Sequence, residues 1–354
     1  MEKIKGKLGF GCMRLPYINN EIDLEQTKEM VDLFLENGFN YFDTAHGYLN
    51  EQSEYIVKEC LTKRYSRDKY LIATKLSPNY FNKNEDIRPF FFKQLDAIGV
   101  DYIDFYLMHC QNKDLFKKYR ECKAYEEAFK LKEEGLIRHV GFSFHDKANV
   151  LDEILTTYPE IEFVQIQFNY LDYEDQNVEA RKCLEVCLKH NKKVMVMEPV
   201  RGGALARLPL EANELLKTLS NDSPASYAIR FAASFPNVVM VLSGMSNLDQ
   251  MKDNISFMKD FKPINEKENE VLKDIVKIIK EVKTIPCTNC KYCLEVCPMQ
   301  VDVPNIFATI NSLRRFNEGN KEVFNNINCI KCGKCEKACP QHIEIRKILE
   351  EVKI

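Results

Sequence analysis

One cysteine pattern occurs twice near the C-terminal end of this 354-residue chain. Each run has the spacing C-x2-C-x2-C-x3-C-P, and the eight cysteines are Cys287, Cys290, Cys293 and Cys297 in the first run and Cys329, Cys332, Cys335 and Cys339 in the second. Three thiolates from one tight turn can reach three corners of an iron–sulfur cubane, but that turn cannot also reach the fourth corner. The doubled pattern therefore predicts a small domain that holds two [4Fe–4S] clusters.

In bacterial two-cluster ferredoxins the fourth ligand of each cluster comes from the other run. This rule predicts two ligand sets: Cys287, Cys290, Cys293 and Cys339 for the first cluster, and Cys329, Cys332, Cys335 and Cys297 for the second. Zinc is the alternative, because paired C-x2-C elements also form zinc sites, but a zinc ion needs only four ligands. Between the runs, Ile306, Ile310 and Leu313 recur at helical spacing, which predicts an α-helical ferredoxin-like domain.

Composition and charge exclude several classes of function. The formal net charge is −3, and the chain has no basic stripe of the kind that binds nucleic acid. No apolar run approaches the roughly 20 residues that cross a bilayer, and the first residues lack an apolar targeting core. Together with the many free thiols, these features predict a cytoplasmic protein that binds neither nucleic acid nor membrane.

Short β-branched or aromatic segments alternate with longer amphipathic segments through the first 260 residues. The predicted strands are Leu8–Met13, Asn40–Asp43, Tyr70–Thr74, Ile103–Met108, Ile137–Phe142, Phe163–Gln167, Lys193–Met197 and Val238–Leu242. The predicted helices are Leu24–Asn37, Ser53–Lys63, Asp86–Ile98, Ala124–Glu134, Lys147–Tyr158, Val178–His190, Pro224–Phe235 and Leu248–Lys259. Eight such pairs predict a (β/α)8 TIM barrel. An open doubly wound sheet is the alternative, but Gly9–Met13 lacks the G-x-G-x-x-G turn of that fold.

We therefore expect an α/β protein with two domains. Residues 1–262 are predicted to form the barrel, residues 263–284 a linker that contains a helix from Glu266 to Glu281, and residues 285–354 the cluster domain.

In a TIM barrel the chemistry gathers at the C-terminal ends of the strands. Asp43 ends the second predicted strand, and Tyr48 follows it in the segment Asp-Thr-Ala-His-Gly-Tyr. Lys75 ends the third predicted strand and His109 ends the fourth. Four ionisable residues in this strand order predict one catalytic site.

These residues resemble the catalytic tetrad of the aldo-keto reductase family in identity, order and strand placement. The resemblance extends over roughly Leu8 to Met258. With the cysteine runs, the whole chain resembles the branch of that family that carries a C-terminal domain with two [4Fe–4S] clusters. The resemblance implies an oxidoreductase that interconverts a small-molecule carbonyl and its alcohol.

Carbonyl reduction needs a hydride on carbon and a proton on oxygen. The resemblance implies that Tyr48 donates the proton, although an unperturbed phenol has a pKa of about 10. A neighbouring Lys75 ammonium is expected to lower that pKa, and Asp43 is expected to hold Lys75 in place. His109 is expected to orient the substrate oxygen and to share in proton transfer.

The resemblance also implies a nicotinamide cofactor, NADP or NAD. The matching positions are Ser143, Gln165, Met197, Pro199, Gly244, Ser246, Gln250 and Asn254. Three positions depart from the family pattern: Phe144 replaces an Asn, Met197 replaces the aromatic residue under the nicotinamide, and Gln250 replaces an Arg that often binds the 2′-phosphate.

A nicotinamide passes two electrons together, whereas an iron–sulfur cluster passes one at a time. A flavin would split the pair, although no flavin motif is recognisable. Three hypotheses follow. In the first, the protein is a reductase whose clusters transfer electrons to or from a redox partner protein. In the second it is a nicotinamide-dependent reductase with purely structural clusters, and in the third it is an electron-transfer protein with a non-catalytic barrel. The substrate, the direction of the reaction and the oligomeric state are not predicted.

Overall fold

The computed structural model describes residues 1–325 and 327–352, and it divides into two compact units. We call Met1–Pro199 with Ser226–Ile264 the barrel unit, and Val200–Ala225 with Asn265–Ile354 the cluster unit. Each unit is described by itself.

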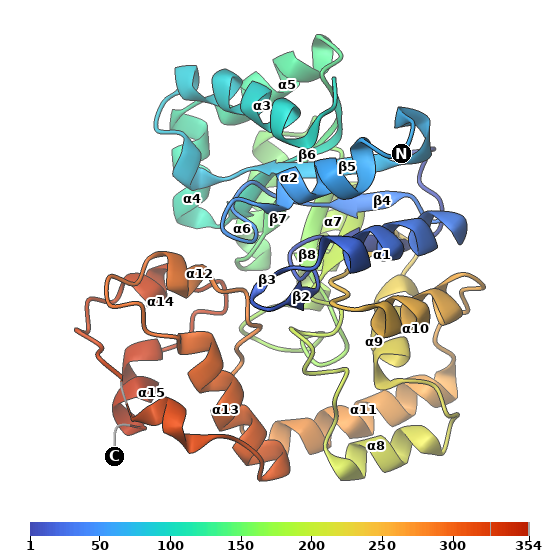
Figure 1. Ribbon diagram of the computed structural model, residues 1–354, viewed down its shortest axis with the longest axis vertical. Helices are drawn as coiled ribbons and strands as arrows, with labels where there is room; N and C mark the ends of the chain where they lie inside the picture. The colour runs from blue at the N-terminus through green and yellow to red at the C-terminus, as the bar shows by residue number, and fades with distance from the viewer. Residues whose placement is uncertain (326, 353–354) are drawn as a thin grey trace. The chain divides into compact units, whose positions relative to one another are not determined.

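The barrel unit contains a closed barrel of parallel strands in the order β1-β10-β9-β8-β7-β6-β5-β4 (Figure 1). Its strands are β1 (Leu8–Gly11), β4 (Tyr41–Asp43), β5 (Leu71–Leu76), β6 (Ile103–Gln111), β7 (Ile137–Phe144), β8 (Phe163–Gln167), β9 (Lys193–Met197) and β10 (Val238–Ser243). All eight predicted strands and the predicted TIM barrel are confirmed. A short hairpin precedes α1 and was not predicted; its strands are β2 (Tyr17–Ile18) and β3 (Glu21–Ile22).

The helices of the barrel unit follow its strands along the chain. They are α1 (Leu24–Glu36), α2 (Ser53–Val57) with a π-helical continuation (Lys58–Thr62), α3 (Asn84–Ile98), α4 (Lys113–Glu121), α5 (Ala124–Glu133), α6 (Ala148–Thr157), α7 (Ala180–Lys189), α9 (Pro224–Ala233) and α10 (Leu248–Met258). Short 3₁₀ turns lie at Arg67–Lys69 and Pro78–Tyr80. The α1 helix shows why such segments are stable: Asp23 caps its N-terminus by accepting from the Gln26 N–H at 3.0 Å, and Met30 and Phe34 are buried.

The barrel interior separates apolar from polar side chains along its axis. Tyr41, Leu71 and Phe163 are the first residues of their strands and belong to a buried hydrophobic cluster. Asp43 and Lys75 lie toward the opposite, C-terminal ends of β4 and β5. The strand starts therefore form the packed floor, and the strand ends carry the ionisable groups.

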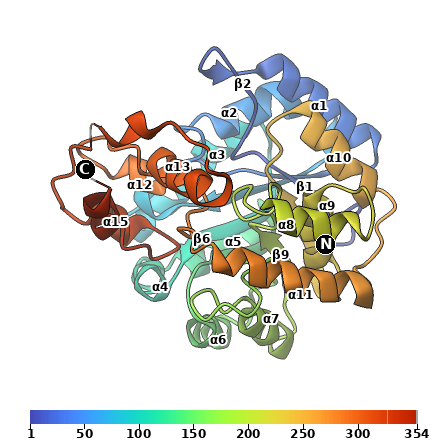
Figure 2. The same cartoon turned by 90° about the horizontal axis from the view of Figure 1, so that it is seen from below.

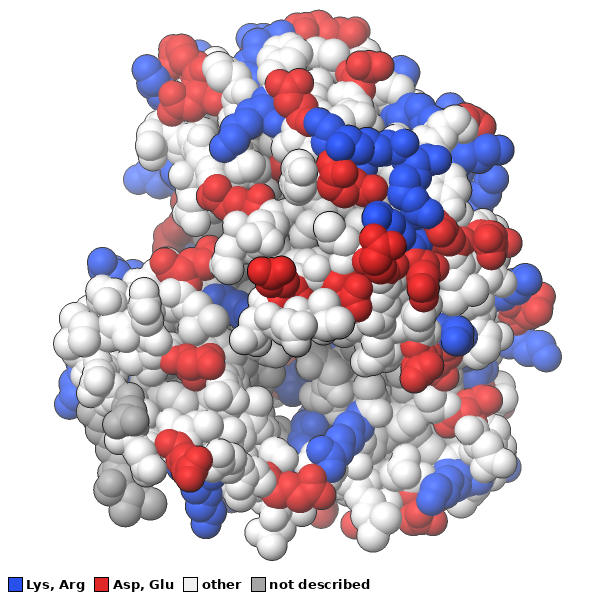
Figure 3. Space-filling view, in the orientation of Figure 1, with Lys and Arg blue, Asp and Glu red and all other residues white. Residues whose placement is uncertain are grey.

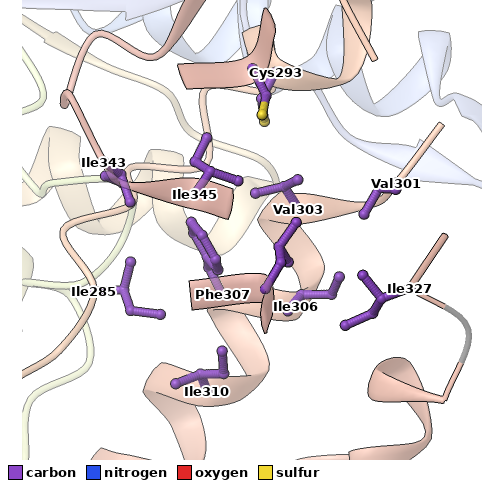
Figure 4. Close-up of a cluster of buried hydrophobic side chains, with 12 residues drawn as sticks. Ile285, Cys293, Val301, Val303, Ile306, Phe307, Ile310, Ile327, Ile343 and Ile345 are labelled. Carbon is purple, nitrogen blue, oxygen red and sulfur yellow. The ribbon is translucent and has the colours of Figure 1, made fainter. Parts of the chain in front are cut away.

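The cluster unit is built from short helices. They are α8 (Leu210–Lys217), α11 (Glu266–Glu281), α12 (Tyr292–Glu295), α13 (Val303–Phe316), a 3₁₀ turn (Lys321–Phe324), α14 (Lys334–Ala338) and α15 (Ile345–Glu351). The helix predicted for residues 266–281 is confirmed with the same ends, and α8 packs against it (Figure 2). Phe307 lies in the hydrophobic core of this unit, and Cys293 lies at its edge (Figure 4).

The segment Val200–Ala225 groups with the cluster unit, although it follows β9 of the barrel. The predicted domain boundaries at residues 262 and 285 stay a prediction, because compactness alone does not define what folds independently.

Charged side chains are distributed over the surface without a large patch of one sign on the face in Figure 3. Within residues 1–325 and 327–352, no helix has both the length and the apolar character that crossing a bilayer requires.

Candidate functional site

The ends of β4 and β5 form a buried ion pair. The Lys75 ammonium donates to Asp43 Oδ1 at 2.6 Å and to the carbonyl of Thr44 at 2.7 Å, and the Lys75 residue is only 1% exposed. Burial alone would lower the pKa of Lys75, but the nearby charges of Asp43 and Tyr48 raise it above its usual value. The neighbouring Asp43 carboxylate thus favours the charged form of Lys75.

Tyr48 lies beside this cation. The Lys75 Nζ atom is 4.7 Å from the centroid of the Tyr48 ring, and the Tyr48 side chain is buried. Burial raises the pKa of Tyr48 to about 12, while the charge and hydrogen-bonding interaction of Lys75 lower it by a smaller amount. Lys75 does lower the Tyr48 pKa, as predicted. The prediction that the Tyr48 pKa falls below its usual value is wrong, because the pKa rises overall. Desolvation of the phenolate is the larger effect.

His109 completes the group from β6. Its Nδ1 atom is 2.7 Å from Ser77 Oγ, and its ring centroid is 6.0 Å from that of Tyr48. Burial, followed by repulsion from Lys75 and His145, lowers the pKa of His109 well below its usual value. A neutral imidazole here can hydrogen-bond an uncharged carbonyl oxygen. The structure therefore brings all four predicted tetrad residues together.

Sequence reasoning missed Ser77, and it ranked His145, which could line the pocket after the fifth strand, as an ordinary loop histidine. Ser77 follows Lys75 by two residues, so the two-residue alternation of a strand places both side chains on one side. From this alternation Ser77 could have been predicted to lie on the same side of the strand as Lys75. His145 comes directly after β7 and lies close enough to His109 to affect its charge.

A second buried group, also missed, lies behind Lys75. The Glu54 carboxylate on α2 accepts from Thr74 Oγ1 at 2.6 Å and from Gln94 Nε2 at 2.7 Å, and it is 2.6 Å from His46 Nδ1. Gln94 also donates to the backbone carbonyl of Lys75 at 3.1 Å. This network fixes the end of β5 that carries Lys75.

Ser143 and Gln165 are direct partners in the register of β7 and β8. The Ser143 hydroxyl oxygen accepts from the Cys110 N–H at 2.9 Å, which leaves the hydroxyl proton to donate. The Oε1 atom of Gln165 is buried and has no hydrogen-bond partner in the described part of the chain. A donor and an acceptor side by side fit the carboxamide of a nicotinamide.

The other predicted cofactor positions fall into two groups. Met197 ends β9 half-buried, and Pro199 two residues later is buried. After β10, the Gln250 side chain accepts from the Ser246 N–H at 2.8 Å, and Asn254 Nδ2 donates to Ser243 Oγ at 2.6 Å. Gln250 is therefore turned toward its own loop.

Arg14 is a cation that sequence reasoning missed near these positions. It forms an ion pair with Glu198 at 3.6 Å, and a Cβ atom added to Gly244 would be 3.6 Å from its Nη1 atom. Arg14 thus links the segments that follow β1, β9 and β10. Phe144, at the position of the family Asn, is buried and packs against Phe142.

Cysteines of both runs lie in or against the hydrophobic core of the cluster unit. One cavity is lined by all four cysteines predicted for the second cluster: Cys297, Cys329, Cys332 and Cys335. Burial, followed by the charges of Cys287, Cys339 and Cys335, raises the pKa of Cys293 to about 12. Cys339 and Cys335 come from the second run, so Cys293 lies near cysteines of both runs, and the cavity also combines Cys297 with cysteines of the second run.

A cubane is the group that fits this arrangement. The ligands of a single metal ion must converge on one point. A [4Fe–4S] cluster presents a separate iron to each thiolate, so its ligands are spread more widely. The six remaining cysteines lie in the barrel unit, and five of them are buried.

Comparisons with known proteins agree with this geometry. A model of the Aldo/keto reductase family matches residues 7–277, and a model of the 4Fe-4S dicluster domain matches residues 286–344. The uncharacterized oxidoreductase YqkF of Bacillus subtilis is 27% identical over 284 residues, which are 70% of this chain and 86% of that protein. The NADH-specific methylglyoxal reductase of Escherichia coli is 28% identical over 223 residues, which are 56% of this chain and 65% of that protein.

Solved structures agree as well. The holo form of aldo-keto reductase AKR11C1 from Bacillus halodurans is 26% identical with a TM-score of 0.60, over 76% of this chain and 91% of that one. An aldo-keto reductase from Klebsiella pneumoniae in complex with NADPH shares the fold at 18% identity with a TM-score of 0.62, over 76% of this chain and 90% of that one. The chain belongs to the aldo/keto reductase family of oxidoreductases, and it carries a 4Fe-4S dicluster domain after its barrel.

Proposed function

We propose that the barrel reduces a small-molecule carbonyl to an alcohol, with Tyr48 as the proton donor. The observation that carries this proposal is the buried Lys75 ammonium, which contacts both the Asp43 carboxylate and the Tyr48 ring. A buried cation of this kind stabilises the phenolate that forms when Tyr48 gives up its proton.

The protonation states support this direction of transfer. A phenol with a pKa raised to about 12 keeps its proton at neutral pH, and the Lys75 cation offsets part of the cost of the phenolate that forms when the proton leaves. Neutral His109, held by Ser77, donates a hydrogen bond to the carbonyl oxygen and orients it. The carbonyl oxygen thus receives the Tyr48 proton, and the carbonyl carbon receives a hydride.

A nicotinamide cofactor supplies that hydride when it is bound. Ser143 and Gln165 would hold its carboxamide, Met197 and Pro199 would lie near its ring, and the segment from Gly244 to Asn254 would hold its adenosine phosphate. The E. coli relative is named as NADH-specific and the K. pneumoniae structure contains NADPH. Gln250 occupies the position of the phosphate-binding Arg, so we propose that the protein accepts both NADH and NADPH. A flavin is the alternative cofactor.

We propose further that the cluster unit holds two [4Fe–4S] clusters that transfer electrons, with the ligand sets Cys287, Cys290, Cys293, Cys339 and Cys329, Cys332, Cys335, Cys297. The cavity lined by the second set supports this proposal. A redox partner protein and a cytoplasmic location stay predictions.

The test is carbonyl-dependent oxidation of NADH or NADPH by anaerobically purified protein and by its Tyr48→Phe variant. We expect the variant to lose roughly 10²- to 10⁴-fold in kcat, the range of a lost general acid. Tyr55→Phe, at an exposed tyrosine of α2, is the matched control and keeps full activity. Equal rates for wild type and Tyr48→Phe would favour the non-catalytic barrel.

The same preparation separates the roles of the clusters. Visible absorbance of the clusters is followed while NADPH, and then a carbonyl substrate, is added without oxygen. Bleaching by NADPH supports electron exchange with the barrel, whereas unchanged absorbance during turnover supports structural clusters.

A further inference from the structure

The connection between β9 and α9 is long and folds with the cluster unit. It spans Val200–Ala225 and contains α8, which packs against α11. In a TIM barrel the connections after the strands form the active-site face. Here the connection begins after the C-terminal end of β9, and its residues fold as part of the cluster unit, which carries the eight cysteines of the two runs.

Two arginine contacts hold the start of this connection to the region of α13. The Arg315 guanidinium donates to the Ala204 carbonyl at 3.1 Å, and Arg207 forms an ion pair with Glu318 at 2.8 Å. The Arg207 guanidinium also lies 4.0 Å from the centroid of the Phe316 ring. Residues 200–207 therefore contact the C-terminal end of α13 and the residues after it at more than one point.

Gly202 makes a close backbone contact with Thr288. Thr288 lies inside the first cysteine run, between Cys287 and Cys290, and it is only 2% exposed. A Cβ atom on Gly202 would be 2.7 Å from the Thr288 carbonyl carbon and 2.8 Å from its Cα, and still closer to its carbonyl oxygen. The two backbones touch directly, and only a residue without a side chain permits this.

We propose that residues 200–204 form a wall of the first [4Fe–4S] site, with Gly202 as the residue that allows the wall to close. This inference rests on the clusters proposed above and assigns a cluster-positioning role to a segment outside both cysteine runs. Gly202 follows Met197 by five residues along the chain.

The cysteines of the second ligand set include an exposed one, whereas those of the first set are all buried or half-buried. Cys332 is the exposed member of the eight cysteines, and the cavity of its group is also lined by Met299 and Ile330, which are 43% and 59% exposed. Solvent exposure is one of the factors that set the potential of a cluster. Reduction adds one negative charge, which burial disfavours. The first cluster should therefore have the lower reduction potential and react more slowly with chelators.

The chain offers a matched pair of glycines for the test. Gly202 and Gly203 both have positive φ, at 61° and 92°, so alanine strains the backbone at either position. A Cβ atom on Gly203 meets no atom within 4 Å. A difference between Gly202→Ala and Gly203→Ala therefore reports the contact with Thr288 rather than the strain.

The variants are made in full-length protein, in wild type and in a Cys332→Ala background that leaves the first cluster as the observed signal. Iron content, the electron paramagnetic resonance spectrum after dithionite reduction, and the rate of iron loss to an added chelator are measured. We expect Gly202→Ala to speed loss of the first cluster by roughly 10- to 100-fold, as for a lost outer-shell contact. Gly203→Ala should match its parent.

If Gly202→Ala does not fold, Arg315→Ala, which releases Ala204, is compared with Arg314→Ala, whose side chain donates to the Lys283 carbonyl. Faster loss of the first cluster in Arg315→Ala alone supports the proposal. Gly202→Ala and Gly203→Ala that retain the first cluster equally overturn it. A wild type without iron instead overturns the proposed clusters, so the two failures are distinguishable.

Discussion

The Nζ atom of Lys75 lies 2.6 Å from Oδ1 of Asp43, and both side chains are almost fully buried. The other carboxylate oxygen of Asp43 is also buried and has no hydrogen-bond partner in the described part of the chain. Each charge is therefore compensated mainly by the other. Neither can be removed alone without leaving an uncompensated charge inside the barrel.

The stability of the barrel should depend on this pair. We expect Lys75→Met to lower the free energy of unfolding by about 3–5 kcal/mol, because it leaves the Asp43 carboxylate buried without its cation. The double variant with Asp43→Asn should lose less than the sum of the two single variants. Urea denaturation monitored by circular dichroism measures all four proteins. Strictly additive losses would contradict the coupling.

His109 should make the fold sensitive to mild acid. Its folded-state pKa is lowered, mainly by burial, so the unfolded chain binds a proton at this residue that the folded chain does not. Stability from this group is present above the unfolded pKa of about 6.5 and falls as the pH drops below it. The slope approaches about 1.4 kcal/mol per pH unit for one such group. His109→Gln should flatten the stability curve between pH 6.5 and the acid transition, and an unchanged slope would contradict a buried neutral histidine.

The network behind Lys75 should matter to folding. Thr74 and Gln94 both donate to Oε1 of Glu54, and Oε2 lies 2.6 Å from His46 Nδ1. In Glu54→Gln an amide nitrogen replaces one of these oxygens, so at least one contact of the network is lost. We expect a loss of about 1–3 kcal/mol in the free energy of unfolding. Glu133→Gln, at an exposed position of α5, is the control and should change stability by less than about 0.5 kcal/mol. Chemical denaturation measures the free energy of unfolding of both variants, and equal values would contradict the predicted role of Glu54.

Iron content should report the two ligand groups. Cys332→Ala removes one ligand of the second set, so the anaerobic protein should contain roughly four irons per chain rather than roughly eight. Cys122→Ala, at the end of α4, is the control and should retain the wild-type amount. An equal iron content in both variants would show that Cys332 is not a ligand.

The strands were predictable because parallel strands in a barrel are buried on both faces and appear as short apolar runs. Phe163–Gln167 and Lys193–Met197 were predicted with the ends that the structure has. The tetrad was predictable because Asp43, Lys75 and His109 are polar residues that interrupt such runs near strand ends. The hairpin Tyr17–Ile22 and the helix Leu210–Lys217 were not predicted, because short segments carry too little periodicity.

Glu54 shows what a local pattern cannot reveal. On its own helix it resembles any surface glutamate, and it becomes fully buried only because Thr74 from β5 and Gln94 from α3 surround it. Burial depends on residues distant in sequence. The same reason explains the pKa of Tyr48, since desolvation comes from the whole barrel wall, whereas the sequence indicated only the nearby cation.

The amino-acid sequence by itself determined the eight-stranded barrel, the order of its ionisable strand ends and the doubled cysteine run, because these depend on local periodicity and spacing. Tertiary structure decided which groups are desolvated and that residues 200–225 fold with the cluster unit. These properties arise from packing between segments far apart in the chain, such as Gly202 against Thr288, and no local pattern encodes them.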